Sequence, residues 1–297
     1  NINNVDFTRI RASLSGSPYQ GFAVLSFGGT IPGGGGSDSH SGGGDNAHLN
    51  ITNSTFSDIG RVGVLIKGTG STATLTGNTY TGKGDGDFLD YGFEVGAGGS
   101  ATISNNTITN NRGVASDSST SAGILVTDFF GTGSNASING NIFSGNTTGL
   151  NVGFSNTDAS VVTAHQNDFS GEVMGVISTN PTVNADSNWW GTGSSTEIIV
   201  KTTGDVLFDP WYVTASMNVL SNVPPTITLN GDASMTVFSS NGFTDPGASA
   251  IDGAGNTLSV PVDGFTHGQG LLPKKTGFVV KYKELGIENP PDVLCQR

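Results

Sequence analysis

The sequence predicts an all-β fold, a right-handed parallel β-helix solenoid with a short C-terminal β extension. A core motif recurs at intervals of 21 to 35 residues: two apolar residues flank one polar residue, and five residues later an aromatic residue or Ile follows. The second apolar residue is in turn Ile51, Leu75, Ile103, Ile138, Ala164 and Ala185, and the later residue is Phe56, Tyr80, Ile108, Phe143, Phe169 and Trp190. A constant core with spacers of unequal length is typical of stacked rungs that carry loops of different size.

A second short strand is expected after each aromatic position, and it begins with Gly. These strands read Gly63-Val64-Leu65, Gly92-Phe93-Glu94, Gly123-Ile124-Leu125, Gly149-Leu150-Asn151 and Gly175-Val176-Ile177. Side chains alternate across a strand, so the residue after each Gly should point inward and the next one outward. Neighbouring rungs should lie about 4.8 Å apart. Ile2 and Phe7 already show the five-residue step, which places the first rung at the start of the chain.

The polar turn between the two halves of the motif carries equivalent residues in successive rungs. They are Ser54, Asn78, Asn106, Asn141, Asn167 and Asn188. Stacked Asn amides can hydrogen-bond to one another, and Asn tolerates the left-handed backbone that a tight bend needs. We therefore expect a ladder of Asn side chains along the solenoid, with these residues themselves at the left-handed bend.

Residues 1–221 resemble secreted bacterial β-helix proteins. The resemblance rests on Asn188-Trp189-Trp190-Gly191, followed by Asp209-Pro210-Trp211, which look like the last rung and exit of that family. It implies the pectate-lyase-like architecture and a secreted or cell-surface location in bacteria. It does not imply one activity, because the same scaffold carries lyases, glycosidases, epimerases and adhesins.

Pro224-Pro225 marks the expected domain boundary. Residues 224–263 resemble the opening half of a bacterial immunoglobulin-like module, through 226–232 and 243–247. Residues 264–297 differ in composition, since they hold four of the seven Lys and the single Cys, Cys295. We interpret them as an atypical tail, out of family or truncated; the alternative is that they supply the missing strands of the module.

Composition narrows the range of partners. The net charge of −12 argues against nucleic acid and favours neutral or cationic partners, or partners bridged by calcium. One Cys excludes a framework of internal disulfides. No apolar run approaches the ~18 residues of a transmembrane helix, so we expect no membrane insertion. The chain opens inside a repeat without a signal peptide, so we expect further sequence upstream, and other domains of a larger surface protein are candidate partners.

Two neighbouring rungs carry long loops, and insertions on one face of a repeat array commonly build the binding face. These loops are 82–91 and 112–122, and the Gly-rich excursion 28–46 is expected near them. The first loop holds Asp85, Asp87 and Asp90, three hard oxygen ligands on a Gly-rich turn. It resembles one calcium-binding nonapeptide repeat, so the sequence predicts a calcium site there.

Glu94 is the first candidate catalytic residue. It should project outward between Leu65 and Leu125, an apolar flank that would raise its pKa and suit a general acid. Tyr91-Gly92-Phe93-Glu94 resembles the catalytic segment of mannuronan epimerases, which implies a catalytic role for Tyr91 as well; that family continues Asp-Pro-His, whereas this chain continues Val95-Gly96. Lys67 and Lys83 lie near the loop and are the candidate substrate-binding residues.

His165 and Asp186 form the second candidate site. They occupy the same outward position in successive rungs, so they should lie about 5 Å apart. A carboxylate beside an imidazole is the orienting half of a nucleophilic triad, and Ser170 or Ser187 would supply the hydroxyl.

Three hypotheses follow, and whether the chain is an enzyme stays open. The first is a secreted or surface carbohydrate-active protein that binds or cleaves a polysaccharide on the loop-bearing face. The second is a non-catalytic adhesin or surface structural protein. The third is a hydrolase of small esters or lactones, dependent on calcium or assisted by His165 and Asp186.

Overall fold

The computed structural model describes residues 1–10, 21–28, 47–222, 224, 226–230, 247–251, 257–260, 278–280 and 293–295. The chain divides into two units, Asn1–Ser221 and Asn222–Arg297. Most of the Gly-rich excursion 28–46 and most of the expected tail lie outside the described residues.

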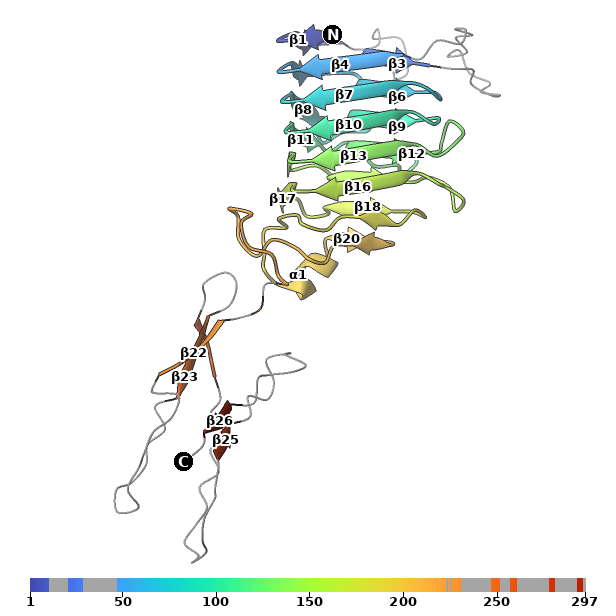
Figure 1. Cartoon of the computed structure of the whole chain (residues 1–297). Coiled ribbons are helices and arrows are strands. Elements are labelled where there is room, and N and C mark those ends of the chain that lie inside the picture. Colours follow the sequence, from blue (N-terminus) through green and yellow to red (C-terminus); the bar gives the residue numbers. More distant parts are fainter. Residues whose placement is uncertain are drawn as a thin grey trace, which may run out of the picture. The chain divides into compact units, whose positions relative to one another are not determined.

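The first unit is a parallel β-helix in which most rungs place one strand in each of three parallel sheets (Figure 1). Sheet A contains β1 (Ile2–Asn3), β4 (His48–Thr52), β7 (Thr72–Thr76), β10 (Ser100–Ser104), β13 (Asn135–Asn139), β16 (Val161–His165), β19 (Val183–Asn184) and β21 (Val206–Leu207). Sheet B contains β2 (Asp6–Thr8), β5 (Thr55–Ser57), β8 (Thr79–Gly84), β11 (Thr107–Asn111), β14 (Ile142–Ser144) and β17 (Asp168–Gly171). Sheet C contains β3 (Phe22–Phe27), β6 (Val62–Lys67), β9 (Tyr91–Gly96), β12 (Ala122–Thr127), β15 (Leu150–Val152), β18 (Val176–Ser178) and β20 (Thr202–Thr203).

The predicted interior columns are confirmed. Strand register pairs Ile51 with Leu75, Leu75 with Ile103, Ile103 with Ile138 and Ile138 with Ala164, and all five side chains are fully buried. The aromatic positions form a second buried column, in which Phe143 stacks on Phe169 at 4.8 Å and Phe169 on Trp190 at 5.0 Å between ring centroids. The constant step of five residues therefore reports one bend between sheets A and B, repeated in every rung.

The expected Asn ladder is also confirmed. Each of Asn78, Asn106, Asn141 and Asn167 donates its side-chain amide to the Oδ1 of the next Asn and to a backbone carbonyl of the preceding rung. The prediction of the left-handed bend was wrong by one position. The residues with positive φ are those just before the ladder, namely Asn53, Gly77, Asn105, Gly140, Gln166 and Ser187. The bend turns one residue early, and this aims the ladder side chains inward.

Glycine at the start of the sheet C strands follows from close packing. A Cβ atom on Gly92 would lie 2.7 Å from the carbonyl oxygen of Gly123 and 2.9 Å from Cγ2 of Ile108. A side chain at this position would push adjacent rungs apart, so the strand must begin with the smallest residue.

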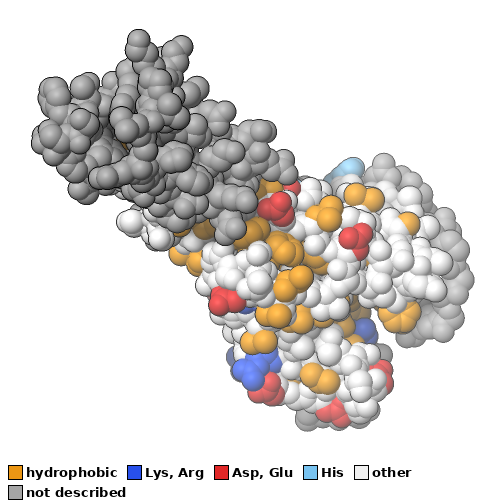
Figure 2. Space-filling model, turned by 90° about the horizontal axis from the view of Figure 1, so that it is seen from below, with side chains coloured by type: hydrophobic (Ala, Val, Ile, Leu, Met, Phe, Trp, Pro, Cys, Tyr) orange, Lys and Arg blue, Asp and Glu red, His pale blue; other side chains and the backbone are white. Residues whose placement is uncertain are grey.

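The chain forms α1 (Ser195–Ile199) between β19 and β20, and its Ile198 is buried in the core. Trp190 is fully buried, and Phe208 lies against it at 6.4 Å between ring centroids. Within the described part of the chain, no helix is long and apolar enough to span a membrane. Seen from below, the described surface is mostly uncharged, with few red or blue side chains (Figure 2).

The described part of the second unit is antiparallel. β22 (Thr226–Leu229), β23 (Ala248–Ile251) and β24 (Thr257–Leu258) form one small sheet, and β25 (Phe278–Val280) pairs with β26 (Val293–Cys295). This is the expected C-terminal β extension. An immunoglobulin-like module at 224–263 and an atypical tail at 264–297 stay predictions, since much of both ranges lies outside the described residues.

Candidate functional site

The outer face of sheet C around β9 holds the first candidate site. Register places Leu65 on one side of Glu94 and Leu125 on the other, as the alternation of the strands predicts. Tyr91 begins the same strand and pairs with Val62 and Ala122. Glu94 is therefore a carboxyl between two apolar side chains of neighbouring strands.

The two long loops lie side by side over this face. Val114 N donates to Gly86 O at 2.9 Å, and Asp90 N donates to Ser121 Oγ at 2.8 Å. Leu89 and Ala115, one from each loop, pack with Val62, Leu65, Tyr91 and Ala122 in a small cluster separate from the main core. We call residues 85–90 and 112–121 the loop cover, because they bury part of the outer face of sheet C.

Glu94 is buried rather than exposed to solvent. Its residue surface is 2 % accessible, and no hydrogen bond reaches its carboxyl from any residue in the described ranges. Burial raises the pKa of Glu94 from 4.5 to about 7, although the positive charges of Arg61 and Lys67 oppose the rise. The expected apolar flank thus has the expected effect on the pKa, and a carboxyl with this pKa can hold a proton near neutral pH and donate it.

Tyr91 and Lys67 lie on the same face. The Tyr91 hydroxyl donates to the carbonyl oxygen of Thr120 at 3.2 Å, and burial raises its pKa well above 10. Tyr91 therefore holds the loop cover and is poorly suited to give up its proton. Lys67 is 6 % exposed, and its Nζ lies 3.8 Å from the centroid of the Phe130 ring.

Lys83 was expected to bind substrate, but its ammonium group contacts other groups of the protein instead. Its Nζ donates to the carbonyl oxygens of Ile59 and Gly60 at 2.7 and 2.9 Å and lies 3.4 Å from Asp90 Oδ2. These contacts fasten the base of the first loop to the neighbouring rung.

The three aspartates expected to bind calcium do not converge. Asp90 is fully buried and accepts hydrogen bonds from the Tyr80 hydroxyl at 2.6 Å and from Lys83 N at 2.8 Å. Asp85 is exposed and paired with Arg112 at 2.8 Å. Among the described residues, no group of three or more His, Cys, Asp or Glu side chains is placed to hold a metal ion. Asp90 instead bonds to Tyr80 and Lys83 of β8, and calcium stays a prediction without a preformed site among the described residues.

The sequence reading missed Arg61 and a group of exposed aromatic residues. Arg61 precedes β6, and its buried Nε has no hydrogen-bond acceptor. Phe129 and Phe154 are 55 % and 60 % exposed, and their rings meet edge to face at 4.8 Å; Phe129 also contacts Phe130. Asp158 Oδ2 accepts hydrogen bonds from Asp128 N and Phe154 N, which holds the two loops together. The signal available was two adjacent Phe in a polar turn.

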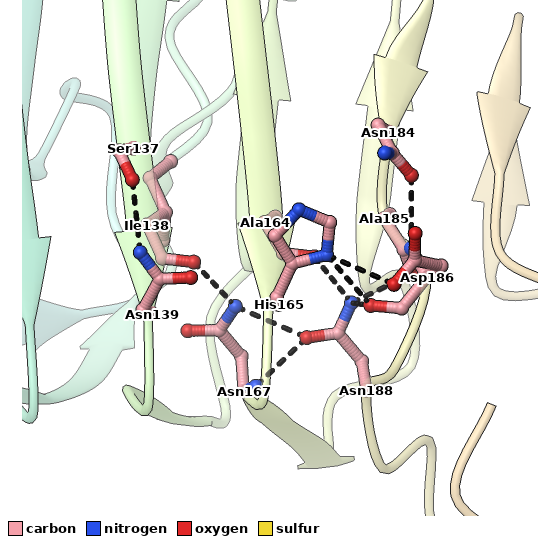
Figure 3. A network of polar contacts seen from close by, with 10 residues as sticks. All are labelled: Ser137, Ile138, Asn139, Ala164, His165, Asn167, Asn184, Ala185, Asp186 and Asn188. Carbon is pink, nitrogen blue, oxygen red and sulfur yellow. Dashed lines mark hydrogen bonds and ion pairs between the residues drawn. The ribbon is translucent and has the colours of Figure 1, made fainter. Parts of the chain in front are cut away.

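His165 and Asp186 meet as predicted. His165 Nδ1 lies 3.1 Å from Asp186 Oδ1, and both side chains are about one-third exposed, at 29 % and 30 %. Figure 3 shows this pair beside Asn167 and Asn188 of the ladder. Neither Ser170 nor Ser187 makes a hydrogen bond to His165 in the described contacts, so the pair is an oriented imidazole without a placed nucleophile.

Glu172 is a second buried carboxyl. It accepts hydrogen bonds from the backbone and side-chain amides of Asn146, whose Oδ1 in turn accepts from Asn111. Burial raises the pKa of Glu172 to about 7. Glu172 ends a short ladder of hydrogen-bonded side chains that begins at Asn111 and Asn146, so we assign it a structural role. It serves as a comparison for Glu94, the other buried carboxyl with a raised pKa.

The two raised pKa values predict how stability depends on pH. Between pH 4.5 and 7 the unfolded chain loses protons that folded Glu94 and Glu172 keep, so the free energy of unfolding should fall as pH rises through this window. Each group should contribute a loss of about 3 kcal/mol, at about 1.4 kcal/mol per pKa unit. Urea unfolding of wild type and Glu94→Gln at pH 5 and pH 8 checks this: the variant should lose less stability and exceed wild type at pH 8. Equal losses would contradict it.

Comparisons with known proteins give the family. A family model described as "Right handed beta helix region" matches residues 41–189, just over half of the 297-residue chain. A search of curated proteins and a search of solved structures each returned no match. The match covers the rungs from β4 to β19 and includes both candidate sites.

Proposed function

Because the chain belongs to the family of right-handed β-helix proteins, we propose that it binds or cleaves a polysaccharide on the outer face of β9, with Glu94 as the general acid. The observation that carries the proposal is the Glu94 carboxyl, 2 % exposed between Leu65 and Leu125, without a hydrogen-bond donor among the described residues. A glycosidic oxygen would be the partner that accepts its proton.

The exposed aromatic rings support a sugar ligand. Phe129 and Phe154 lie on the turns that follow β12 and β15, two strands of the same sheet as Glu94. Phe130 lies above the face itself, since a Cβ atom on Gly96 would lie 3.1 Å from its ring. Aromatic rings offer flat apolar area at a low cost in conformational entropy, which suits stacking against a sugar ring.

We infer that the loop cover opens to admit a polysaccharide, because Leu89 and Ala115 of the cover belong to one cluster with Leu65, the neighbour of the buried Glu94. The cover begins after Gly84, which has a φ of +82°, and it includes Gly86 and Gly113. Active-site loops commonly open and close around ligands on such hinges. A closed cover also excludes water, which strengthens the electrostatic effect of the carboxyl once a ligand is bound.

Two other functions have an observation in their favour. The near-complete burial of Glu94 is equally suited to a non-catalytic adhesin or surface structural protein, whose cover would never open. The 3.1 Å contact between His165 and Asp186 favours an ester or lactone hydrolase on the outer face of sheet A. We also propose that the protein is secreted or lies on a bacterial cell surface, as the resemblance of residues 1–221 to secreted bacterial β-helix proteins implies.

A panel of soluble polysaccharides and chromogenic esters tests the proposal. The full chain is incubated with each substrate, with and without a chelator, and new reducing ends, released chromophore and binding are measured. We expect binding or cleavage of a polysaccharide and no ester hydrolysis. Ester hydrolysis alone would overturn the proposal in favour of the hydrolase. Loss of activity with chelator would support a calcium ion.

A further inference from the structure

Two basic residues near Glu94 differ in their partners from the basic residues of the loops. Lys83 and Arg112, the basic residues of the loops, are paired with Asp90 and Asp85. Arg61 and Lys67 form no ion pair with any residue that the structure describes, and the guanidinium Nε of Arg61 has no acceptor. In a chain with a net charge of −12, two basic side chains that form no ion pair with a described carboxylate are unexpected.

These two residues lie at the two ends of β6, the strand that pairs with the Glu94 strand β9 in sheet C. Arg61 comes directly before β6, and its carbonyl oxygen accepts a hydrogen bond from Tyr91 N at 2.8 Å. Lys67 ends β6 and pairs in register with Gly96. Leu65, which pairs with Glu94, lies between them. Both positive charges act on the Glu94 carboxyl, so all three groups belong to one site.

The buried Nε of Arg61 has a cost without a ligand, whereas the Lys67 ammonium is partly stabilised by the Phe130 ring. A buried polar group without a partner costs about 1–3 kcal/mol, and a buried charge costs more. Glu94 offsets only part of this cost near neutral pH, because its pKa is raised to about 7. An oxyanion brought by a ligand would supply the missing acceptor, and a guanidinium is well shaped for a carboxylate or a sulfate.

We propose that the Glu94 face takes an acidic polysaccharide, in which a carboxylate or sulfate group of one sugar binds between Arg61 and Lys67. This inference rests on the proposed polysaccharide function and specifies its substrate class. It departs from the expectation of neutral or cationic partners that the net charge suggests, because Arg61 and Lys67 bring two positive charges close to Glu94.

Matched polymers test the proposal by isothermal titration calorimetry with the full chain. One pair is polygalacturonate and its fully methyl-esterified form; the other is dextran sulfate and dextran. We expect one charged polymer to bind at least about tenfold more tightly than its neutral counterpart, and the pair that shows this identifies carboxylate or sulfate. Equal affinity for the charged and neutral members of both pairs would overturn the inference.

Variants distinguish specific binding by Arg61 and Lys67 from non-specific attraction between the polymer and any basic side chain. Arg61→Gln and Lys67→Gln should each weaken binding at least about tenfold, and Arg112→Gln, which removes a guanidinium already paired with Asp85, should change it less than about twofold. Thermal melting checks that each variant is folded, and Lys67→Gln stands in if Arg61→Gln is not. An equal effect of Arg112→Gln would overturn the inference.

The outcome also distinguishes this inference from the proposed function. Binding of a neutral polysaccharide that depends on Glu94 but not on Arg61 or Lys67 would overturn the inference and leave the proposed function standing. Failure of all polysaccharides to bind would overturn both.

Discussion

Replacing Glu94 with Gln should lower the rate of polysaccharide cleavage ~100-fold or more. Gln keeps the size of the side chain and removes the proton that a general acid donates. The side chain should stay in place, because Leu65 and Leu125 flank it and no hydrogen bond to a described residue is lost. The rate is measured as new reducing ends on the substrate that the polysaccharide panel identifies.

His165→Ala is the matched control for this experiment. It removes the other candidate general acid or base, on sheet A, and should leave the rate of cleavage nearly unchanged. The opposite pattern, with loss of rate only in His165→Ala, would move the site to His165 and Asp186. A rate untouched by either change would leave the carboxyl without a role in catalysis and favour the binding or structural function.

Replacing Asn141 with Ala should destabilise the fold strongly. Asn141 is fully buried; its Oδ1 accepts from the backbone and side-chain amides of Asn106 at 2.9 Å, and its Nδ2 donates to Ile103 O at 2.9 Å and Asn167 Oδ1 at 3.0 Å. The Ala variant leaves several buried groups without partners, at about 1–3 kcal/mol each, so we expect a loss of about 3 kcal/mol or more. Urea unfolding measures it.

Asn139→Ala is the control, two residues away and outside the core. Asn139 is half-buried, and among the described residues its side chain donates only to Ser137 Oγ, at 2.9 Å. Its replacement should cost less than about 1 kcal/mol. Similar losses in the two variants would show that the ladder does not stabilise the rungs as described.

The rungs could be predicted because each side chain in them has one dominant reason for its position. Ile51, Leu75 and Ile103 must face the core, and a register error of one residue would turn all of them outward. The Asn of the polar turn is equally constrained, since its amide must satisfy the backbone of two neighbouring rungs. The pairing of His165 with Asp186 followed from the same register.

The surroundings of Glu94 could be predicted only in part. The strand register predicted that Leu65 and Leu125 flank Glu94, and these apolar neighbours predicted that its pKa is raised. Its burial depends on how two loops pack over sheet C, and loops carry no periodic pattern. The inward turn of Asp90, the anchoring role of Lys83 and the place of Arg61 all follow from that packing, so spacing alone did not predict them.

The most direct test of the account is a measurement of the Glu94 pKa. Carbon-13 NMR of the side-chain carboxyl groups is recorded against pH, and the signal of Glu94 is assigned by its absence in Glu94→Gln. We expect a midpoint of about 7 for this signal. A midpoint at or below the ordinary value of 4.5 would show that the carboxyl is charged near neutral pH and would contradict its role as the acid on this face.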